Sequence, residues 1–227
     1  MITAQTQLVA LLGHPVSNSL SPRMQNAAFA ARGLDWTYVA LDVEPDAFAI
    51  AVRGLVASGF AGVNVTTPHK LAAAELADSD ELSVNTLVFD DGVVRGYSTD
   101  AAILEELDAE SPVILGDGGT ATAFRQALPG ARVFARRGDW PPDVEGADLV
   151  VNATSERDEV LVELRAGQTL IDLPYPETAT AAAARAVGAN VVDGLDVLVA
   201  QGAHAFEIWT GVPAPVDVMR AAVRSDA

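Results

Sequence analysis

Short apolar runs alternate with amphipathic runs along this chain of 227 residues. The apolar runs are rich in Val, Leu and Ile, as in QLVALLG at residues 7–13, and they predict buried strands. The runs between them place apolar residues at helical spacing. Because strands that alternate with helices are typical of parallel sheets, we expect an α/β fold.

The first half of the chain begins with repeated strand–helix pairs. Strands are predicted at residues 7–13, 36–43 and 61–65, and helices at residues 21–33, 45–59 and 68–78. In the first helix, Ser21 is the predicted N-cap, Pro22 the first helical residue and Gly33 the terminator. Residues 83–98 carry DDG between two β-rich runs, which predicts a hairpin, and a helix is expected over residues 99–108.

A second series begins after a break in the pattern near residues 98–112, which suggests a domain boundary. Strands are predicted at residues 112–116, 131–135, 148–154, 168–173 and 190–193, and helices at residues 120–128, 179–188, 194–211 and 215–225. The link from Arg137 to Asp148 has two prolines and little helical pattern. A crossover between parallel strands normally contains a helix, so this unit is predicted to have lost one.

The net charge of −17 changes the picture of possible partners. Nucleic acids and anionic membranes both require a basic face, so neither is expected to bind. The chain contains no cysteine, which excludes disulfides and thiolate chemistry. Its N-terminus lacks the basic segment of a signal peptide, and no apolar run approaches the roughly 18 residues of a membrane span. We therefore expect a soluble cytoplasmic protein.

A glycine-rich turn, LGDGGTA at residues 115–121, follows a predicted strand and opens a predicted helix. Gly116 can form the tight turn, and Gly118 and Gly119 allow the backbone to approach a pyrophosphate at the helix N-terminus. Arg136 lies about twenty residues further on, where an arginine can bind the 2′-phosphate of NADP. The alternative for the glycine-rich turn is a purely structural turn, and the alternative for Arg136 and Arg137 is an ordinary solvated strand end. Asp117 disagrees with phosphate binding, because its carboxylate would repel the ligand.

Lys70 is the only lysine in the chain, and the other thirteen basic residues are arginine. Thr67 is the predicted N-cap and Pro68 the first residue of its helix, so Lys70 is expected in the first turn. A cation there faces the positive end of the helix dipole. Because arginine cannot release its proton, a proton-transfer role explains the choice of lysine. Asp100 is the candidate carboxylate partner of Lys70. The alternatives are that Lys70 is simply a solvated lysine and that Asp100 is a helix cap.

Motifs along nearly the whole chain resemble the shikimate dehydrogenases. They are GHPVSNSLSPRMQNAAF, GVNVTTPHK, VNTL, STD, GDGGTA, NATS, DLPYP and GLDVLVAQGAHAFEIWTG. The resemblance implies a substrate-binding α/β domain at residues 1–99 plus 203–227. It also implies a Rossmann-like NAD(P)-binding domain at residues 100–202, with the catalytic cleft between the two. The implied reaction is the reversible NADPH-dependent reduction of 3-dehydroshikimate to shikimate, with NADP rather than NAD as the cofactor.

The resemblance also implies a role for individual residues. Lys70 and Asp100 correspond to the catalytic pair. The implied substrate-binding residues are Ser19, Ser21, Thr66, Asn85, Tyr175 and Gln201. The implied cofactor-binding residues are Gly116, Gly118, Gly119, Thr120, Ala121, Arg136, Arg137, Asn152 and Thr154. No metal site is implied, the ligands are small molecules, and the protein is expected to be a monomer or homodimer.

The chain departs from the family pattern mainly in and beside its cofactor half. The departures are Asn18, Ser98, Ala101, Asp117 and Ala135, together with shorter links after Lys70, before residue 112 and after Arg137. A substrate-binding protein that has lost cofactor binding is therefore an alternative. A dehydrogenase of quinate or an aminated shikimate is a further alternative, because the sequence does not resolve these related substrates from shikimate. His14, His69 and His204 are interpreted as packing groups, and Phe206 and Trp209 as core residues.

Overall fold

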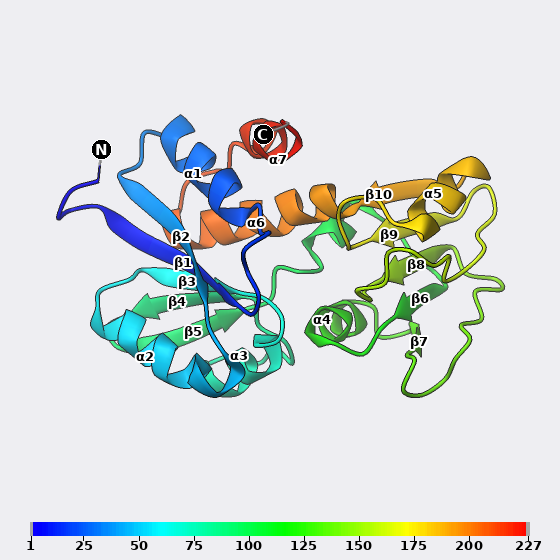
Figure 1. Ribbon diagram of the computed structural model, residues 1–227, viewed down its shortest axis with the longest axis horizontal. Helices are drawn as coiled ribbons and strands as arrows, with labels where there is room; N and C mark the ends of the chain where they lie inside the picture. Colours follow the sequence, from blue (N-terminus) through cyan, green and yellow to red (C-terminus); the bar gives the residue numbers. More distant parts are fainter. Residues whose placement is uncertain (1, 226–227) are drawn as a thin grey trace. The chain divides into compact units, whose positions relative to one another are not determined.

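The computed structural model describes residues 2–225, over which the chain forms two compact units (Figure 1). Within the described residues, unit 1 comprises residues 2–99 and 199–225, and unit 2 comprises Asp100–Leu198. Within the described residues each unit contains a five-stranded sheet with helices packed against it. The α/β fold class is confirmed.

The sheet of unit 1 has the strand order β2-β1-β3-β4-β5. Its strands are β1 (Gln7–Gly13), β2 (Trp36–Asp42), β3 (Gly62–Val65), β4 (Thr86–Asp90) and β5 (Val93–Tyr97). Strands β2, β1 and β3 are parallel, and β4 and β5 add an antiparallel hairpin. Asp91 and Gly92 form its turn with φ angles of 46° and 81°, the positive values that a two-residue hairpin loop requires.

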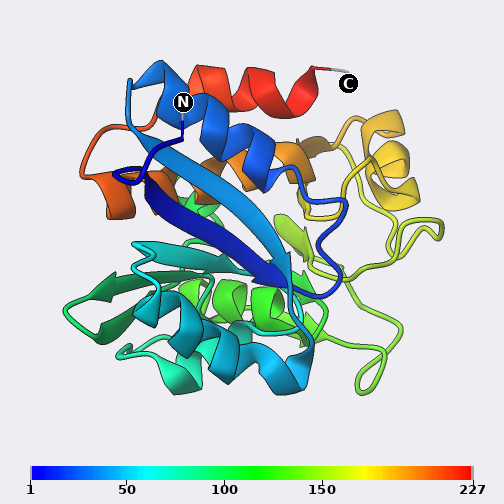
Figure 2. The same ribbon diagram turned by 60° about the vertical axis from the view of Figure 1, so that its left-hand side comes forward.

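Helices cover both faces of this sheet (Figure 2). The helices of unit 1 are α1 (Ser21–Ala31), α2 (Phe48–Ala57), α3 (Lys70–Leu76), α7 (Val216–Arg224) and the second part of α6 (Gly194–Thr210). Ala10 and Leu12 of β1 pack in the core with Phe48 and Val52 of α2. Side chains alternate along a strand, so Val9 and Leu11 project from the opposite face and are also buried there.

The sheet of unit 2 has the order β10-β9-β8-β6-β7, and every pairing in it is parallel. Its elements are β6 (Pro112–Leu115), α4 (Gly119–Ala127), β7 (Arg132–Phe134), β8 (Leu149–Asn152), β9 (Thr169–Asp172), α5 (Ala179–Ala186) and β10 (Asn190–Asp193). This order matches a Rossmann sheet, 3-2-1-4-5-6, in which strand 3 is missing and β7 forms the edge.

The predicted loss of a crossover helix is confirmed. β7 and β8 flank β6, yet the described residues 135–148 that connect them contain no helix. The next link, residues 153–168, also lacks one. Val162 and Leu164 of that link are buried against Val150 and Leu170, so apolar loop residues help to cover a sheet face that would otherwise be open to water.

Several predicted helix starts were wrong, including three at or beside predicted site residues. Leu20, not Ser21, is the N-cap of α1, because Ser19 Oγ accepts the Ser21 N–H at 3.2 Å and the helix begins one residue earlier. α3 begins at Lys70 rather than Pro68. The preceding residues form a turn instead, in which the His69 N–H binds the Thr66 carbonyl at 2.9 Å. Lys70 nevertheless lies in the first turn, as predicted.

The third error concerns the segment after Thr99. It forms a short 3-10 helix, η2 (Ala102–Glu106), with Ala101 as N-cap, so neither Thr99 nor Asp100 is a cap. Acidic side chains gather at the end of this segment, including Glu105, Glu106 and Asp108. Negative charge at a helix C-terminus opposes the helix dipole, which disfavours a longer α-helix here.

Candidate active site

In unit 1, candidate residues follow the carboxyl ends of parallel strands. β1 ends at Gly13 and leads to the segment that contains Ser19, and β3 ends at Val65 and leads directly to Thr66. Since these strands are parallel neighbours, the segments that follow them start at the same edge of the sheet, where α/β proteins place ligands. Gly13 permits a close approach there, because a Cβ atom on it would lie 2.3 Å from Thr66 Cγ2.

Lys70 is the first residue of α3, and only 8% of its surface is exposed. Its backbone carbonyl accepts the Val84 N–H at 3.1 Å, which ties the start of the helix to the chain just before Asn85. The neighbouring His69 is buried, with Nε2 2.8 Å from the Val43 carbonyl oxygen and its ring stacked on Phe48 at 4.7 Å. These contacts support the interpretation of His69 as a packing group that anchors the start of α3.

Asn85 is the centre of a buried polar network. Its Oδ1 accepts the Thr99 N–H at 2.8 Å, while its Nδ2 lies 2.9 Å from Thr99 Oγ1 and 3.3 Å from Gln201 Oε1. Thr99 Oγ1 in turn donates to the Gln201 carbonyl oxygen at 3.0 Å. The structure thus brings together Asn85 and Gln201, two predicted substrate-binding residues separated by 116 positions.

Asn64, which was not among the predicted site residues, supports this network from β3. Its Nδ2 donates to the Asn85 carbonyl oxygen at 3.1 Å and to Thr86 Oγ1 at 3.0 Å, and its Oδ1 accepts the Tyr38 hydroxyl at 2.8 Å. Each of these side chains is at least 95% buried. An asparagine inside the apolar run GVNV was the signal in the sequence, because a buried amide requires several polar partners.

In unit 2, the glycine-rich turn connects β6 to the N-terminus of α4, as expected. Gly116 has a φ of 121°, and a Cβ atom on it would lie 3.0 Å from the Ala153 carbonyl oxygen. Gly118 is the N-cap of α4, and a Cβ atom on it would meet nothing within 4 Å apart from atoms of the adjoining backbone. A strained turn followed by open space at a helix N-terminus fits a dinucleotide pyrophosphate. Asp117 is exposed beside this space.

Arg136 follows the carboxyl end of β7 and is held by two carboxylates. Its Nη2 lies 2.8 Å from Glu159 Oε2 and 3.4 Å from Glu156 Oε2. Its guanidinium carbon also lies 5.6 Å from the centre of the Trp140 ring, within the range of a cation–π contact. The adjacent Arg137 is exposed.

Asn152 and Thr154 follow β8 at the same sheet edge. Asn152 is fully buried and donates to Asp172 Oδ1 at 2.7 Å, while its own Oδ1 accepts the Thr154 hydroxyl at 2.8 Å. Burial raises the pKa of Asp172, against the lowering effect of hydrogen bonds from Asn152 and Thr178. Asn152 is therefore positioned to shape the loop that starts at Thr154, and Asp172 is a buried polar residue that the sequence interpretation missed.

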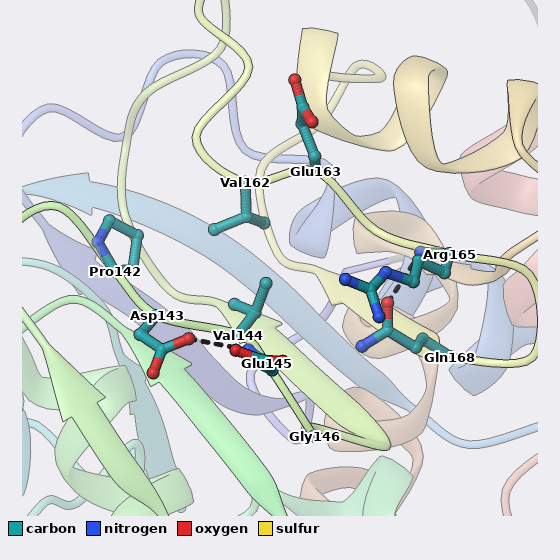
Figure 3. A pocket seen from close by; sticks show the side chains of 9 residues that line it. All are labelled: Pro142, Asp143, Val144, Glu145, Gly146, Val162, Glu163, Arg165 and Gln168. Atoms are coloured by element: carbon teal, nitrogen blue, oxygen red, sulfur yellow. Dashed lines mark hydrogen bonds between the residues drawn. The ribbon is translucent and has the colours of Figure 1, made fainter.

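Unit 2 also contains a cavity of about 300 Å³, and Figure 3 shows the side chains that line it. Its lining residues lie in two segments, 142–146 and 162–168, which precede β8 and β9 and therefore approach the amino ends of the strands. Asp143 and Gln168, which line it, accept the backbone N–H groups of Glu145 and Arg165. Parallel sheets bind ligands at their carboxyl ends, so this cavity is not the candidate cofactor site.

Comparison with known proteins decides the family. The family model described as "Shikimate dehydrogenase substrate binding domain" matches residues 11–86, and "Shikimate 5'-dehydrogenase C-terminal domain" matches residues 194–224. A relative from Moorella thermoacetica named shikimate dehydrogenase (NADP(+)) is 41% identical, over 98% of this chain and 94% of the relative. The chain belongs to the shikimate dehydrogenase family. The resemblance seen in the sequence is thereby confirmed.

Solved structures of shikimate dehydrogenases have the same fold. The enzyme of Aquifex aeolicus superimposes with a TM-score of 0.90 at 32% identity, covering 99% of this chain and 100% of that chain. The enzyme of Thermus thermophilus, described in complex with NADP(H) and shikimate, gives a TM-score of 0.84 at 31% identity, with 96% and 98% covered. The match to the Moorella enzyme extends over 278 aligned positions, more than the residues of this chain, which is therefore a shortened family member.

Among the site residues implied by the family, two pairs are in direct contact in the structure, and others are placed by their position in an element. Asn85 and Gln201 are in contact, as are Asn152 and Thr154. Ser21 is 94% buried at the start of α1, Ser19 binds its N–H, and Thr120 and Ala121 lie in the first turn of α4. Tyr175 follows β9, and the 94% buried Asp100 follows Thr99 directly. The roles of these residues, and the pairing of Lys70 with Asp100, remain predictions.

The described residues 2–225 contain no group of three or more His, Cys, Asp or Glu side chains arranged to hold a metal ion. No helix in this range is long and apolar enough to cross a membrane.

Of the predicted core residues, Phe206 is fully buried, whereas Trp209 is partly buried and donates its indole N–H to the Leu87 carbonyl oxygen at 3.1 Å.

Proposed function

We propose that this protein catalyses the reversible NADPH-dependent reduction of 3-dehydroshikimate to shikimate. The observation that carries this proposal is the cluster of Asn85, Thr99 and Gln201, built at the sheet edge that also bears Thr66 and Lys70, in a member of the shikimate dehydrogenase family. The cluster offers neutral hydrogen-bonding groups of the kind that recognise ring hydroxyls. A carboxylate can likewise be held by the hydroxyls of Ser19 and Ser21, so the acidic surface is no obstacle.

Lys70 and Asp100 are proposed to handle the proton. In the oxidative direction the hydroxyl proton of the substrate moves to this pair as the carbinol carbon releases hydride. In the reductive direction the pair returns the proton to the carbonyl oxygen, so that an alcohol forms with no charge left on oxygen. Tyr175, Thr66, Asn85 and Gln201 would hold the ring so that one carbon faces the hydride acceptor.

NADP would supply the hydride acceptor or donor when bound. Gly118 would leave room for its pyrophosphate at the N-terminus of α4, after the tight turn at Gly116, with Gly119, Thr120 and Ala121 in the first turn of the helix. Arg136, assisted by Arg137, would bind the 2′-phosphate. Asn152 would act through Thr154, since its own side chain is fully buried.

A spectrophotometric assay tests the proposal directly. Purified protein is incubated with shikimate and NADP, then with shikimate and NAD, and the formation of reduced cofactor is followed by absorbance. Turnover with shikimate and NADP that exceeds turnover with NAD is the expected result. Absence of turnover with either cofactor would contradict the proposal.

Quinate and aminated shikimate remain alternative substrates, because both are cyclic hydroxy acids closely related to shikimate: quinate has a saturated ring with one more hydroxyl, and aminated shikimate has an amino group in place of a hydroxyl. A quinate dehydrogenase from Corynebacterium glutamicum, described in complex with NAD, matches with a TM-score of 0.79 at 25% identity, covering 96% of this chain and 98% of that chain. Comparison of kcat/KM for the three compounds with each cofactor ranks these alternatives. A higher value for quinate with NAD would replace the leading proposal.

Two observations favour a second function, that of a substrate-binding protein without a cofactor. Arg136 already pairs with Glu156 and Glu159, and the crossover between β7 and β8 has lost its helix. Titration of the protein with NADPH, followed by cofactor fluorescence, separates the two functions. A saturable change supports the enzyme, whereas shikimate binding without any NADPH binding supports the binding protein.

A cytoplasmic location and a monomeric or homodimeric state are part of the same proposal. Both rest on the sequence expectations described above. Size-exclusion chromatography with light scattering measures the oligomeric state, and a tetramer or larger assembly would contradict it.

A further inference from the structure

Four side chains form a charged cluster beyond the carboxyl end of β7. The guanidinium of Arg136 contacts Glu156 and Glu159 through the same nitrogen, Nη2, and lies over the ring of Trp140. Two carboxylates face one guanidinium, so the cluster carries a net charge of about −1 when all three groups are ionised. The residue proposed to attract a phosphate therefore sits in a locally negative environment.

Glu156 is held in this position by the backbone. Its Oε1 accepts the N–H groups of Arg157 and Asp158 at 3.0 Å each and that of Glu159 at 3.4 Å. These backbone hydrogen bonds, that of Asp158 foremost, lower the pKa of Glu156 and keep its carboxylate ionised. Successive N–H groups of this kind form an anion-binding nest, which here is filled by a carboxylate of the chain itself.

Glu159 is free to move by comparison. Two thirds of its side chain is exposed, and Arg136 is the partner that its carboxylate contacts among the described residues. The backbone of Glu159 is anchored, because its carbonyl oxygen accepts the Thr180 hydroxyl at 3.3 Å. The carboxylate can therefore leave Arg136 through side-chain rotation alone, without a change in the loop.

We propose that Glu159, supported by the fixed charge of Glu156, competes with the 2′-phosphate of NADP for Arg136 and thereby lowers the preference of this protein for NADP over NAD. This inference rests on the proposed function. The 2′-phosphate carries between one and two negative charges near pH 7, so it must displace Glu159 and lie close to Glu156. NAD has a neutral 2′-hydroxyl at the same position and is not repelled.

The experiment measures cofactor affinity rather than turnover. NADPH and NADH are titrated separately into the wild type and into Glu159→Gln, and Kd is obtained from cofactor fluorescence. Glutamine keeps the size of the side chain and removes its charge. Glu163→Gln is the matched control, because it removes one charge from an exposed residue in the same unit, near the amino ends of the strands. Arg136→Gln and the double variant Arg136→Gln/Glu159→Gln complete a double-mutant cycle, which isolates the interaction between Arg136 and Glu159.

Glu159→Gln is expected to lower the Kd of NADPH about threefold to fivefold, as for the loss of an exposed ion pair, and to change the Kd of NADH less than twofold. The effect on NADPH should vanish in the Arg136→Gln background. An unchanged ratio of the two Kd values, or the same change in Glu163→Gln, would overturn the inference while leaving the proposed function intact. A wild type that binds neither cofactor would overturn the proposed function and this inference with it.

Discussion

Asn85 and Thr99 bind each other through two polar groups each. The Asn85 Oδ1 accepts the Thr99 N–H at 2.8 Å, and the Asn85 Nδ2 donates to Thr99 Oγ1 at 2.9 Å. Thr99 is the residue at which the chain leaves unit 1, and Gln201, which joins the pair, lies just after its return at Val199. The network thus joins the residue after which the chain leaves unit 1 to the segment in which it returns. Asn85, a predicted substrate-binding residue, contacts both.

Asn85→Ala is expected to destabilise the protein by about 1–3 kcal/mol, because it leaves the buried Thr99 N–H without its acceptor. It should also raise KM for shikimate, since Asn85 is a proposed substrate contact. Urea unfolding measures the free energy of unfolding, and steady-state kinetics measures KM. Asn190→Ala, at an exposed asparagine of β10, is the control and should change stability by less than about 0.5 kcal/mol. Equal stability of the two variants would contradict the structural role of the network.

Lys70→Ala is expected to lower kcat by about 100-fold or more while leaving shikimate binding largely intact, because proton transfer is lost but the ring contacts remain. Lys70→Arg keeps the positive charge but cannot release a proton, so it should be nearly as inactive. Steady-state kinetics gives kcat, and isothermal titration gives the affinity for shikimate. Near-wild-type turnover in the alanine variant would refute the assignment, and an active arginine variant would indicate that only the charge matters.

His14 is expected to make stability depend on pH. The hydrogen bond that the His14 Nδ1–H donates to Asp42 Oδ1, at 2.6 Å between the two atoms, raises the pKa of His14 above its usual 6.5, and the Glu44 charge adds to this effect. The folded protein therefore holds this proton more tightly than the unfolded chain. The contribution is fully present below a pH of about 6.5 and is lost as the pH rises through the folded-state pKa.

Asp42, the partner of His14, makes stability depend on pH in the opposite direction. The same hydrogen bond lowers the pKa of Asp42 below 3.8, so its contribution is present above that pH and is lost as the pH falls through the folded-state pKa. Urea midpoints of the wild type and of His14→Asn, measured from pH 5 to pH 9, check the prediction for His14. The difference between the two proteins should shrink toward the alkaline end, and a difference that does not vary with pH would contradict it.

Asp117→Asn is expected to tighten binding of NADPH and NADH by the same factor, about twofold to fivefold, because the pyrophosphate is common to both cofactors. Glu159→Gln, in contrast, should affect NADPH alone. Fluorescence titrations with both cofactors distinguish the two patterns, with Glu163→Gln again as the control for net charge. Unchanged Kd values in Asp117→Asn would mean that the carboxylate points away from the phosphate site.

Local signals predicted most of the secondary structure. The DDG turn and the helix end at Gly33 are specified by positive φ angles, and the strand at residues 7–13 by a continuous run of apolar residues that is buried on both faces of the sheet. The helix starts at Ser21 and Pro68 were less predictable, because the polar groups that begin a helix can be bound by other partners. Ser19 binds the first N–H of α1, and the Thr66–His69 turn replaces a cap before α3.

The sequence by itself determined the order of strands and helices, the glycine-rich turn, the lone lysine and the missing crossover helix, since these depend on residues close together in the chain. Only the tertiary structure decided the polar partners. Asn85 contacts Gln201, which lies 116 positions further along the chain. Arg136 follows β7 and Glu159 follows β8, and the two residues meet because both strands are neighbours of β6 in the sheet. Such pairs depend on which strands become neighbours, and burial in a shared core, rather than any local pattern, sets that order.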